Sequence, residues 1–163
     1  MIKFFLLGAN DGFDHNERRR DARDVAMAWL NRKSWPVYAN TKNRKAFEPG
    51  AGVVFYIGGK ASSGQTIIGS ARIALIRPAT SAERLGVGMG EKTPSEVLEF
   101  EPLEFFPVPV PIRPLIDKLE MFVQVPQRWG IALVGGSRRI SQADFDLILE
   151  SAKLARVEGL TPG

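Results

Sequence analysis

The spacing of apolar residues predicts a short buried strand, a helix and then a series of strands. Residues 2–7, apolar except for Lys3, predict a short buried strand that ends at Gly8, before the turn-forming Asn10-Asp11-Gly12. From about Glu17 to Leu30, apolar residues recur at helical spacing, while arginines and aspartates occupy the opposite face. The segments that follow are typical of strands: Trp35–Ala39, Val53–Ile57, about Gln65–Ile76 and Val97–Phe106.

The C-terminal part of the chain predicts an extended connection and two helices. Residues 106–111 alternate with proline, which removes ladder donors, so we do not expect a central strand there. Pro114 suits the first turn of a helix from about Leu115 to Phe122. Ser141 opens a capping-box-like start to the last helix, whose apolar stripe is Phe145, Ile148 and Leu149.

Length and element order predict one domain. A chain of 163 residues is about the size of one domain, and it contains no internal repeat and no low-complexity tract. The order of strand, helix, several strands and short helices is typical of an α+β domain around an antiparallel, barrel-like sheet. We expect this domain to span residues 1–155, with residues 156–163 as a frayed tail.

Several kinds of catalytic site are excluded by composition. The chain has no cysteine, so it has no disulfide, thiolate zinc site or cysteine nucleophile. Its single histidine, His15, cannot form a metal site with others and has no nucleophile elbow nearby. The glycine-rich residues 86–90 are not followed by the Lys-Ser/Thr of a Walker loop. We therefore expect no catalytic residue, no metal and no cofactor.

Charge and hydropathy bear on partners and location. The net charge of +4 points weakly to a polyanionic partner. No stretch approaches 18 apolar residues, and the first seven residues run into a turn too early for a signal segment. These features predict a cytoplasmic protein without a membrane partner, and they leave its oligomeric state open.

A polar, basic loop separates two of the predicted strands. The segment Asn40-Thr41-Lys42-Asn43-Arg44-Lys45 places two amides, a hydroxyl and three cations between strands that carry aromatic residues. Amides in loops are commonly turn formers. The loop is therefore either a solvated connection or one wall of a site for a polar, anionic ligand.

The order of five segments resembles the EVE domain of the PUA-like superfamily, over about residues 2–150: LLGAND, WPVYANTKNRKAFEPGAGVVFYIGG, QTIIGSARI, FFPVPVPIRPLI and SRRISQADFDLIL. The resemblance implies a PUA-like antiparallel pseudo-barrel flanked by short helices. It also implies a non-catalytic module that binds DNA or RNA and reads a modified base. The chain departs from the family pattern at Phe4-Phe5, at Gly8–Asp11 and at Gly50–Gly52, which concerns the pocket more than the fold.

The resemblance and the residue types together suggest a binding site. An aromatic wall such as Trp35 can stack on an extruded base, amides can read its edge, and cations can contact phosphates. The family places one pocket wall at the end of the first strand, and a serine-arginine segment after Gly135-Gly136 could clamp the backbone. The candidate binding residues are Asn10, Asp11, Trp35, Asn40, Thr41, Lys42, Asn43, Arg44, Lys45, Ser137, Arg138 and Arg139.

Two other classes of function stay open. One is a small-ligand sensor or interaction domain that binds no nucleic acid. The other is an enzyme acting on RNA or a nucleotide, with carboxylates from Asp11 and Asp14 or from Glu99, Glu101 and Glu104. The glutamates alternate along a predicted strand, so they share a solvent face rather than converge.

Overall fold

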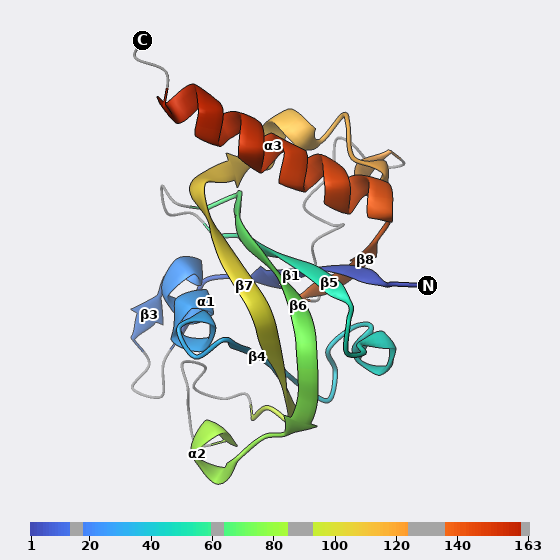
Figure 1. Ribbon diagram of the computed structural model, residues 1–163. Coiled ribbons are helices and arrows are strands. Elements are labelled where there is room, and N and C mark those ends of the chain that lie inside the picture. Colours follow the sequence, from blue (N-terminus) through green and yellow to red (C-terminus); the bar gives the residue numbers. More distant parts are fainter. Residues whose placement is uncertain (14–17, 60–63, 85–92, 124–135, 161–163) are drawn as a thin grey trace.

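The structure, a computed structural model, describes residues 1–13, 18–59, 64–84, 93–123 and 136–160. A six-stranded, curled sheet has the order β4-β7-β6-β5-β1-β8 (Figure 1). Its strands are β1 Phe4–Ala9, β4 Ser34–Val37, β5 Gly52–Ile57, β6 Thr66–Pro78, β7 Glu96–Pro111 and β8 Ser137–Ile140. A two-stranded ribbon pairs β2 Gly12–Phe13 with β3 Arg19–Arg20, and the helices are α1 Ala22–Leu30, α2 Ser81–Arg84 and α3 Gln142–Leu160.

Strands β1 and β5 form the buried centre of the fold. They run parallel, with Phe4 opposite Gly52 and Ala9 opposite Ile57. β1 also pairs with β8, β5 with β6, β6 with β7 and β7 with β4, and all these pairs are antiparallel. The predicted α+β class and barrel-like sheet are confirmed, with the β1–β5 pair as a parallel exception.

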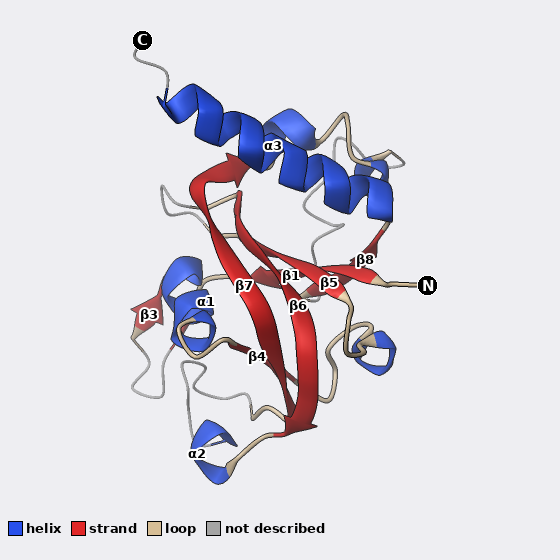
Figure 2. Cartoon of the chain, in the orientation of Figure 1, coloured by secondary structure: helices blue, strands red, loops and turns tan. Residues whose placement is uncertain are grey.

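Alternating side chains of β1 divide the core between the two faces of the sheet. Phe5 and Leu7 belong to a cluster with residues of α1, whereas Phe4 and Leu6 belong to a cluster with residues of α3. Helices lie on both sides of the sheet in Figure 2. This double cover explains why the first strand reads as a continuous apolar run rather than an alternating one.

The predicted helix from Glu17 begins later than expected. Arg19 and Arg20 are in β3, opposite Phe13 and Gly12, and α1 begins at Ala22. The Asp11 carboxylate accepts a hydrogen bond of 2.9 Å from the Ala22 backbone N–H, so a distant residue supplies the cap at this end. The prediction was wrong for residues 18–21 because helical spacing alone does not reveal this cap.

The predicted helix over Leu115–Phe122 was also wrong. Two 3₁₀ turns occupy the region instead: η2 Arg113–Leu115, which holds the expected early proline, and η3 Glu120–Phe122. The buried Asp144 carboxylate accepts hydrogen bonds from the backbone N–H groups of Glu120 and Met121, at 2.8 and 3.0 Å. These bonds satisfy the start of η3 and separate it from η2.

Strand β7 continues through the proline-rich residues 106–111, contrary to the prediction of a mere connection. Its pairing with β4 covers only Glu96–Glu99, so the later half has β6 as its one neighbour among the described strands. The β6–β7 register also shifts between Ile67 and Gly69, which leaves part of this segment out of the ladder. Prolines are tolerated where a strand has a free edge or a bulge.

The last helix begins as expected. The Ser141 hydroxyl oxygen accepts a hydrogen bond of 3.1 Å from the Asp144 backbone N–H, as an N-cap serine does. α3 then runs to Leu160. The extent of the domain and of a frayed tail stays a prediction.

The sheet does not close between its edge strands, β4 and β8. We call the opening between these strands the seam. The loop after β4 covers it, and this loop contains the 3₁₀ turn η1 Arg44–Ala46. The Asn43 side-chain amide lies 3.5 Å from the Ser137 carbonyl oxygen, and the ring of Phe47 packs edge-on against Phe5 with centroids 4.9 Å apart. The loop therefore bridges from one edge of the sheet to the other.

Candidate functional site

A pocket of about 300 Å³ opens where β1 ends, between α1 and the loop that covers the seam. Four segments and one glycine before β8 contribute to it. The residues that line it are Gly8, Ala9, Asn10, Asp11, Val25, Ala26, Trp29, Trp35, Pro36, Tyr38, Asn40, Thr41 and Gly136. The structure thus brings together five of the predicted site residues, from the end of β1, from β4 and from the loop.

Trp35 is held by aromatic packing behind it. Its ring lies 5.5 Å from that of Phe55, tilted by 33°, and Phe55 meets Phe100 edge-on at 5.2 Å. Trp35 is 8% exposed, so it belongs to the core and to the pocket wall at once. Such packing fixes the indole before any ligand arrives.

A second tryptophan, Trp29, forms part of the wall on α1. Its indole nitrogen is buried and has no hydrogen-bond partner within the described part of the chain. The guanidinium of Arg32 lies 5.9 Å from the centre of the Trp29 ring, within range of a cation–π contact. Arg32 also lies 3.6 Å from the buried carboxylate of Glu83 on α2.

Glu83 anchors an ion-pair network next to this wall. It accepts hydrogen bonds from Arg77 Nη1 at 2.7 Å and Nη2 at 2.9 Å, and from the Thr80 backbone N–H at 2.9 Å. The hydrogen bonds from Arg77 lower the pKa of the Glu83 carboxyl to about 2, against the opposing effect of burial. The carboxylate is therefore ionised at neutral pH, and it ties β6 and α2 to the end of α1.

Asp11 is part of the pocket wall, but both its carboxylate oxygens are engaged. Oδ2 accepts a hydrogen bond of 2.8 Å from Arg19, and Oδ1 accepts the Ala22 backbone N–H that begins α1. A negative charge at a helix N-terminus is favourable. Asp11 therefore positions α1 and its own strand end.

Asn10 is an exposed residue of the same strand end. Its side chain forms no hydrogen bond to the residues that the structure describes, and its amide oxygen packs against Gly58 at the end of β5. The backbone beneath it is fixed, because Gly58 donates a hydrogen bond of 2.8 Å to the Ala9 carbonyl oxygen. Asn10 thus offers an amide on a rigid support.

The opposite wall is a turn made by Tyr38 and Thr41. The Tyr38 backbone N–H donates to the Thr41 hydroxyl oxygen at 2.8 Å, and the Thr41 N–H donates to the Tyr38 carbonyl oxygen at 3.0 Å. This turn presents Asn40, whose side chain is exposed and has no hydrogen bond to described residues. Burial raises the pKa of the Tyr38 hydroxyl to about 12, so the group is neutral at ordinary pH.

The other residues of the basic loop lie outside the pocket. Lys42, Arg44 and Lys45 are exposed, and they form no ion pair with the described part of the chain. Asn43 adopts a left-handed backbone conformation, with φ of 64°, and points its amide at the Ser137 carbonyl oxygen. The structure therefore assigns Asn43 to bridging the seam.

The predicted Ser137-Arg138-Arg139 clamp is divided by the strand that contains it. Ser137 and Arg139 pair with Leu7 and Phe5, and so share the face of the sheet that packs on α1. Arg138 pairs with Leu6 on the other face, where its guanidinium donates to the Met121 carbonyl oxygen at 3.2 Å. Ser137 is buried, so only Arg139 is freely exposed.

Sequence reasoning missed part of the pocket. Trp29, Val25 and Ala26 read as an ordinary core stripe of the helix, and Tyr38 stood at the end of a predicted strand without further signal. The apolar stripe of α1 was visible in the sequence. Its position opposite the 40–41 turn depends on the tertiary fold.

Metal binding and carboxylate chemistry gain no support from the geometry. Within the described residues, no group of three or more histidine or acidic side chains could hold a metal ion. Glu99 accepts a hydrogen bond of 3.1 Å from Arg77, and Glu101 and Glu104 are exposed on β7 away from the pocket lining. Asp14 and His15 lie outside the described residues, as does Trp129. No helix among the described residues has the length and apolar character needed to span a membrane.

Comparisons with known proteins show similarity in structure. No family model matches the chain, and no curated protein matches it in sequence. The N-terminal domain of McrB from Staphylothermus marinus is similar, with 11% identity, a TM-score of 0.58 and coverage of 90% of this chain and 93% of that one. Human THYN1, solved in complex with 5-methylcytosine containing DNA, has 15% identity and a TM-score of 0.57, covering 93% of this chain and 98% of that one.

A third similar structure is the YTH domain of the Zygosaccharomyces rouxii MRB1 protein in complex with N6-methyladenosine RNA. It has 14% identity and a TM-score of 0.54, and the match covers 94% of this chain and 88% of that one. At such identities, the likeness concerns the fold alone. The curled sheet between α1 and α3 is thus the fold that the sequence resemblance implied, and the chain has a PUA-like fold.

Proposed function

We propose that this chain is a non-catalytic nucleic-acid-binding module that takes one modified base of DNA or RNA into the pocket. The observation that carries the proposal is the lining of this pocket. Two tryptophans and a tyrosine lie beside the exposed amides of Asn10 and Asn40, whose side chains form no hydrogen bond to the described residues. Aromatic faces and amide edges are the two kinds of group that recognise an extruded base.

The size and walls of the pocket suit a single ring system. Its volume of about 300 Å³ is at the small end of the range for ligand sites. Stacking on an aromatic side chain contributes about 1–3 kcal/mol per base. That gain is comparable with the few kcal/mol that removing a base from its stack costs.

The pocket interior suits a neutral group rather than a phosphate. Asp11, the one charged residue among the described residues of the lining, is paired with Arg19. The hydroxyl of Tyr38 is neutral because its pKa is about 12. Asn10 and Asn40 can each donate and accept hydrogen bonds, as the edge of a base requires.

The structural neighbours support this choice of ligand. THYN1 and the YTH domain were solved with methylated DNA and methylated RNA, and both have the fold of this chain. The exposed Lys42, Arg44 and Lys45 directly follow the pocket residues Asn40 and Thr41. In the proposed function they form a basic rim that contacts phosphates.

Tryptophan fluorescence tests the proposal directly, because Trp29 and Trp35 line the pocket. The protein is titrated with short single- and double-stranded oligonucleotides that are unmodified or contain 5-methylcytosine or N6-methyladenine. We expect quenching that depends on the modification. An absence of any response at low salt would reject the proposal and favour a small-ligand sensor.

A pair of variants makes this test specific to the pocket. Asn40→Ala removes an amide of the lining, and Gln142→Ala removes an exposed amide at the start of α3. We expect Asn40→Ala to weaken binding of the preferred oligonucleotide by about tenfold, which is the upper range for one hydrogen bond. Equal affinities of the two variants would contradict a role for the amide.

A further inference from the structure

Cations from three separate segments gather beside the loop that covers the seam. They are Lys3, before β1, then Lys42, Arg44 and Lys45 of the loop, and Arg139 of β8. We call these residues the seam surface. The loop adjoins the pocket residues Asn40 and Thr41 in sequence, and β8 begins directly after the pocket residue Gly136.

Contacts on both sides of η1 bring these segments together. Lys3 donates to the Ala46 carbonyl oxygen at 3.5 Å and lies 3.5 Å from the Glu48 carboxylate. Arg139 is opposite Phe5, and the Phe5 ring contacts Phe47, just after η1. Because paired residues share a face of a sheet, Arg139 lies on the side of the sheet that η1 covers.

Most of this charge is uncompensated. Glu48 is paired with Lys3, whereas Lys42, Arg44, Lys45 and Arg139 are exposed and form no ion pair within the described part of the chain. Four exposed, unpaired cations on one surface favour a partner with repeated negative charge.

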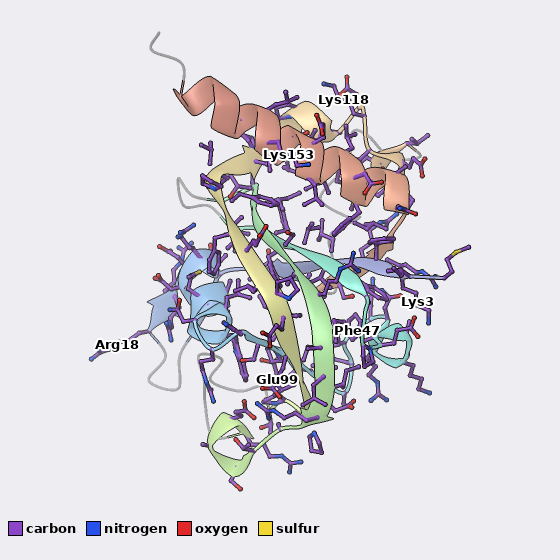
Figure 3. The ribbon with its side chains drawn as sticks, viewed as in Figure 1. Lys3, Arg18, Phe47, Glu99, Lys118 and Lys153 are labelled. Carbon is purple, nitrogen blue, oxygen red and sulfur yellow. The ribbon has the colours of Figure 1, made fainter. Side chains whose placement is uncertain are left out.

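The opposite side of the pocket has a different balance of charge. The four described cations there, Arg18, Arg19, Arg20 and Arg23, are accompanied by the three acids Asp11, Asp21 and Asp24, whereas the five cations of the seam surface are accompanied by Glu48. Figure 3 shows Arg18 on the left of the view, and Lys3 and Phe47 on the right. The excess positive charge therefore lies on the seam side of the pocket.

We propose that the seam surface binds the phosphates of the nucleotides that flank the base on one side only, which rests on the proposed function of the pocket. A strand whose base enters the pocket lined by Trp29 and Trp35 leaves it past Asn40 and Thr41. It then follows the loop over the seam toward Arg139 and Lys3. The footprint on the nucleic acid is asymmetric, and a bound base needs neighbours on one side for full affinity.

A charge-matched pair of variants tests the seam surface. Lys45→Gln with Arg139→Gln removes two of its cations. Lys118→Gln with Lys153→Gln removes two exposed lysines at or near α3, at the top of the molecule in Figure 3. Binding of single strands that contain 5-methylcytosine or N6-methyladenine is measured over a range of salt concentrations. Each lost phosphate contact lowers the slope of log K against log salt by about 0.7 for a single strand.

We therefore expect the seam variant to lose about 1.4 from this slope while the control keeps the wild-type slope. Equal slopes in the two variants would overturn the proposal. The asymmetry is tested by placing the modified nucleotide at either end of the strand. Only one of the two placements should respond to the seam variant, and an equal response would refute a one-sided footprint.

The methylated nucleoside, which has no phosphate, separates this proposal from the function of the pocket. Its affinity should be the same in wild type, seam variant and control. Modification-dependent binding with equal slopes would reject the seam surface and retain the base reader. Salt-dependent binding that ignores the modification, but weakens in the seam variant, would reject the base reader and retain the seam surface. If the wild-type protein binds no oligonucleotide at low salt, both the base-reading pocket and the seam-surface proposal are rejected.

Discussion

At the scale of single residues, Asn10 depends on a glycine of the neighbouring strand end. A Cβ atom at Gly58 would collide with the Asn10 amide oxygen and would lie 3.2 Å from the Ala9 carbonyl oxygen. The absence of a side chain at position 58 therefore lets Asn10 occupy its place at the pocket. The parallel pairing of β1 with β5 is what puts these two residues side by side.

Gly58→Ala should weaken ligand binding through Asn10. The Asn10 amide is displaced and loses its hydrogen bond to the ligand, so binding becomes weaker by about 1 kcal/mol, as for one hydrogen bond. Isothermal titration with the preferred methylated oligonucleotide measures the loss. In an Asn10→Ala background, Gly58→Ala should have almost no further effect, because the two residues act as one unit. Additive losses would show that Gly58 acts by another route.

The sequence predicted part of the pocket lining. Asn10, Asn40 and Thr41 were predicted from the family resemblance, and the last two also from the cluster of polar residues in the loop; all three line the pocket. Trp29 was not predicted, since an aromatic residue on an apolar helical stripe looks the same whether the stripe faces core or cavity. Arg138 was predicted as a clamp, but strand alternation directs it to the other face.

At the scale of elements, ion pairs between side chains link the connection between β6 and β7 to the end of α1. Arg77 lies near the end of β6, Glu83 lies on α2, and Arg32 lies two residues after α1. The Glu83 carboxylate is buried and ionised, so its removal leaves the Arg77 guanidinium without its main partner.

Acid should weaken the protein through Glu83. Its folded pKa of about 2 lies below the ordinary value of 4.5, so its contribution is fully present above pH 4.5 and is lost as the pH falls toward 2. The shift corresponds to about 3 kcal/mol of unfolding free energy. Urea unfolding at several pH values should show this loss in wild type and a flatter profile in Glu83→Gln.

Glu99→Gln is the matched control, since Glu99 binds the same Arg77 but is 41% exposed. Solvent screens exposed ion pairs, so this variant should lose less stability and keep the wild-type acid profile. Equal dependence of the unfolding free energy on pH in the two variants would indicate that Glu83 does not dominate the loss of stability in acid.

Helices and strands were predictable from the sequence where the burial of their side chains determines the pattern of apolar residues. Residues 4–7 and 53–57 are apolar throughout because both faces are covered, and they lie in β1 and β5. The start of α1 and the break between η2 and η3 depend on Asp11 and Asp144, which cap them from distant positions. The spacing of apolar residues within a segment does not indicate which distant side chains will cap it.

At the scale of the whole molecule, charge and stability are separable. The basic loop contributes Phe47 to the core, but its cations extend into solvent. Surface substitutions away from packed or capping positions change stability little. The field that attracts a polyanion can therefore be altered without disturbing the fold.

Replacement of Lys42, Arg44 and Lys45 together by alanine should lower nucleic-acid affinity while the melting temperature barely moves. The three side chains have no ion pair to lose within the described part of the chain. Anisotropy titrations and thermal melts of the same samples provide the two readouts. Unaltered binding would mean that the loop is only a connection, and a large fall in melting temperature would mean that it is structural.

The double cover of β1 has a consequence for how the molecule opens. Phe4 and Leu6 pack toward α3, while Phe5 and Leu7 pack toward α1, so the strand cannot separate from one layer without loosening the other. The core clusters on the two faces of the sheet should therefore unfold as one cooperative unit. The backbone amides of β1 and β5 should be the last to exchange with deuterium. A destabilising substitution in α3, far from the pocket, would therefore weaken ligand binding by lowering the population of folded molecules.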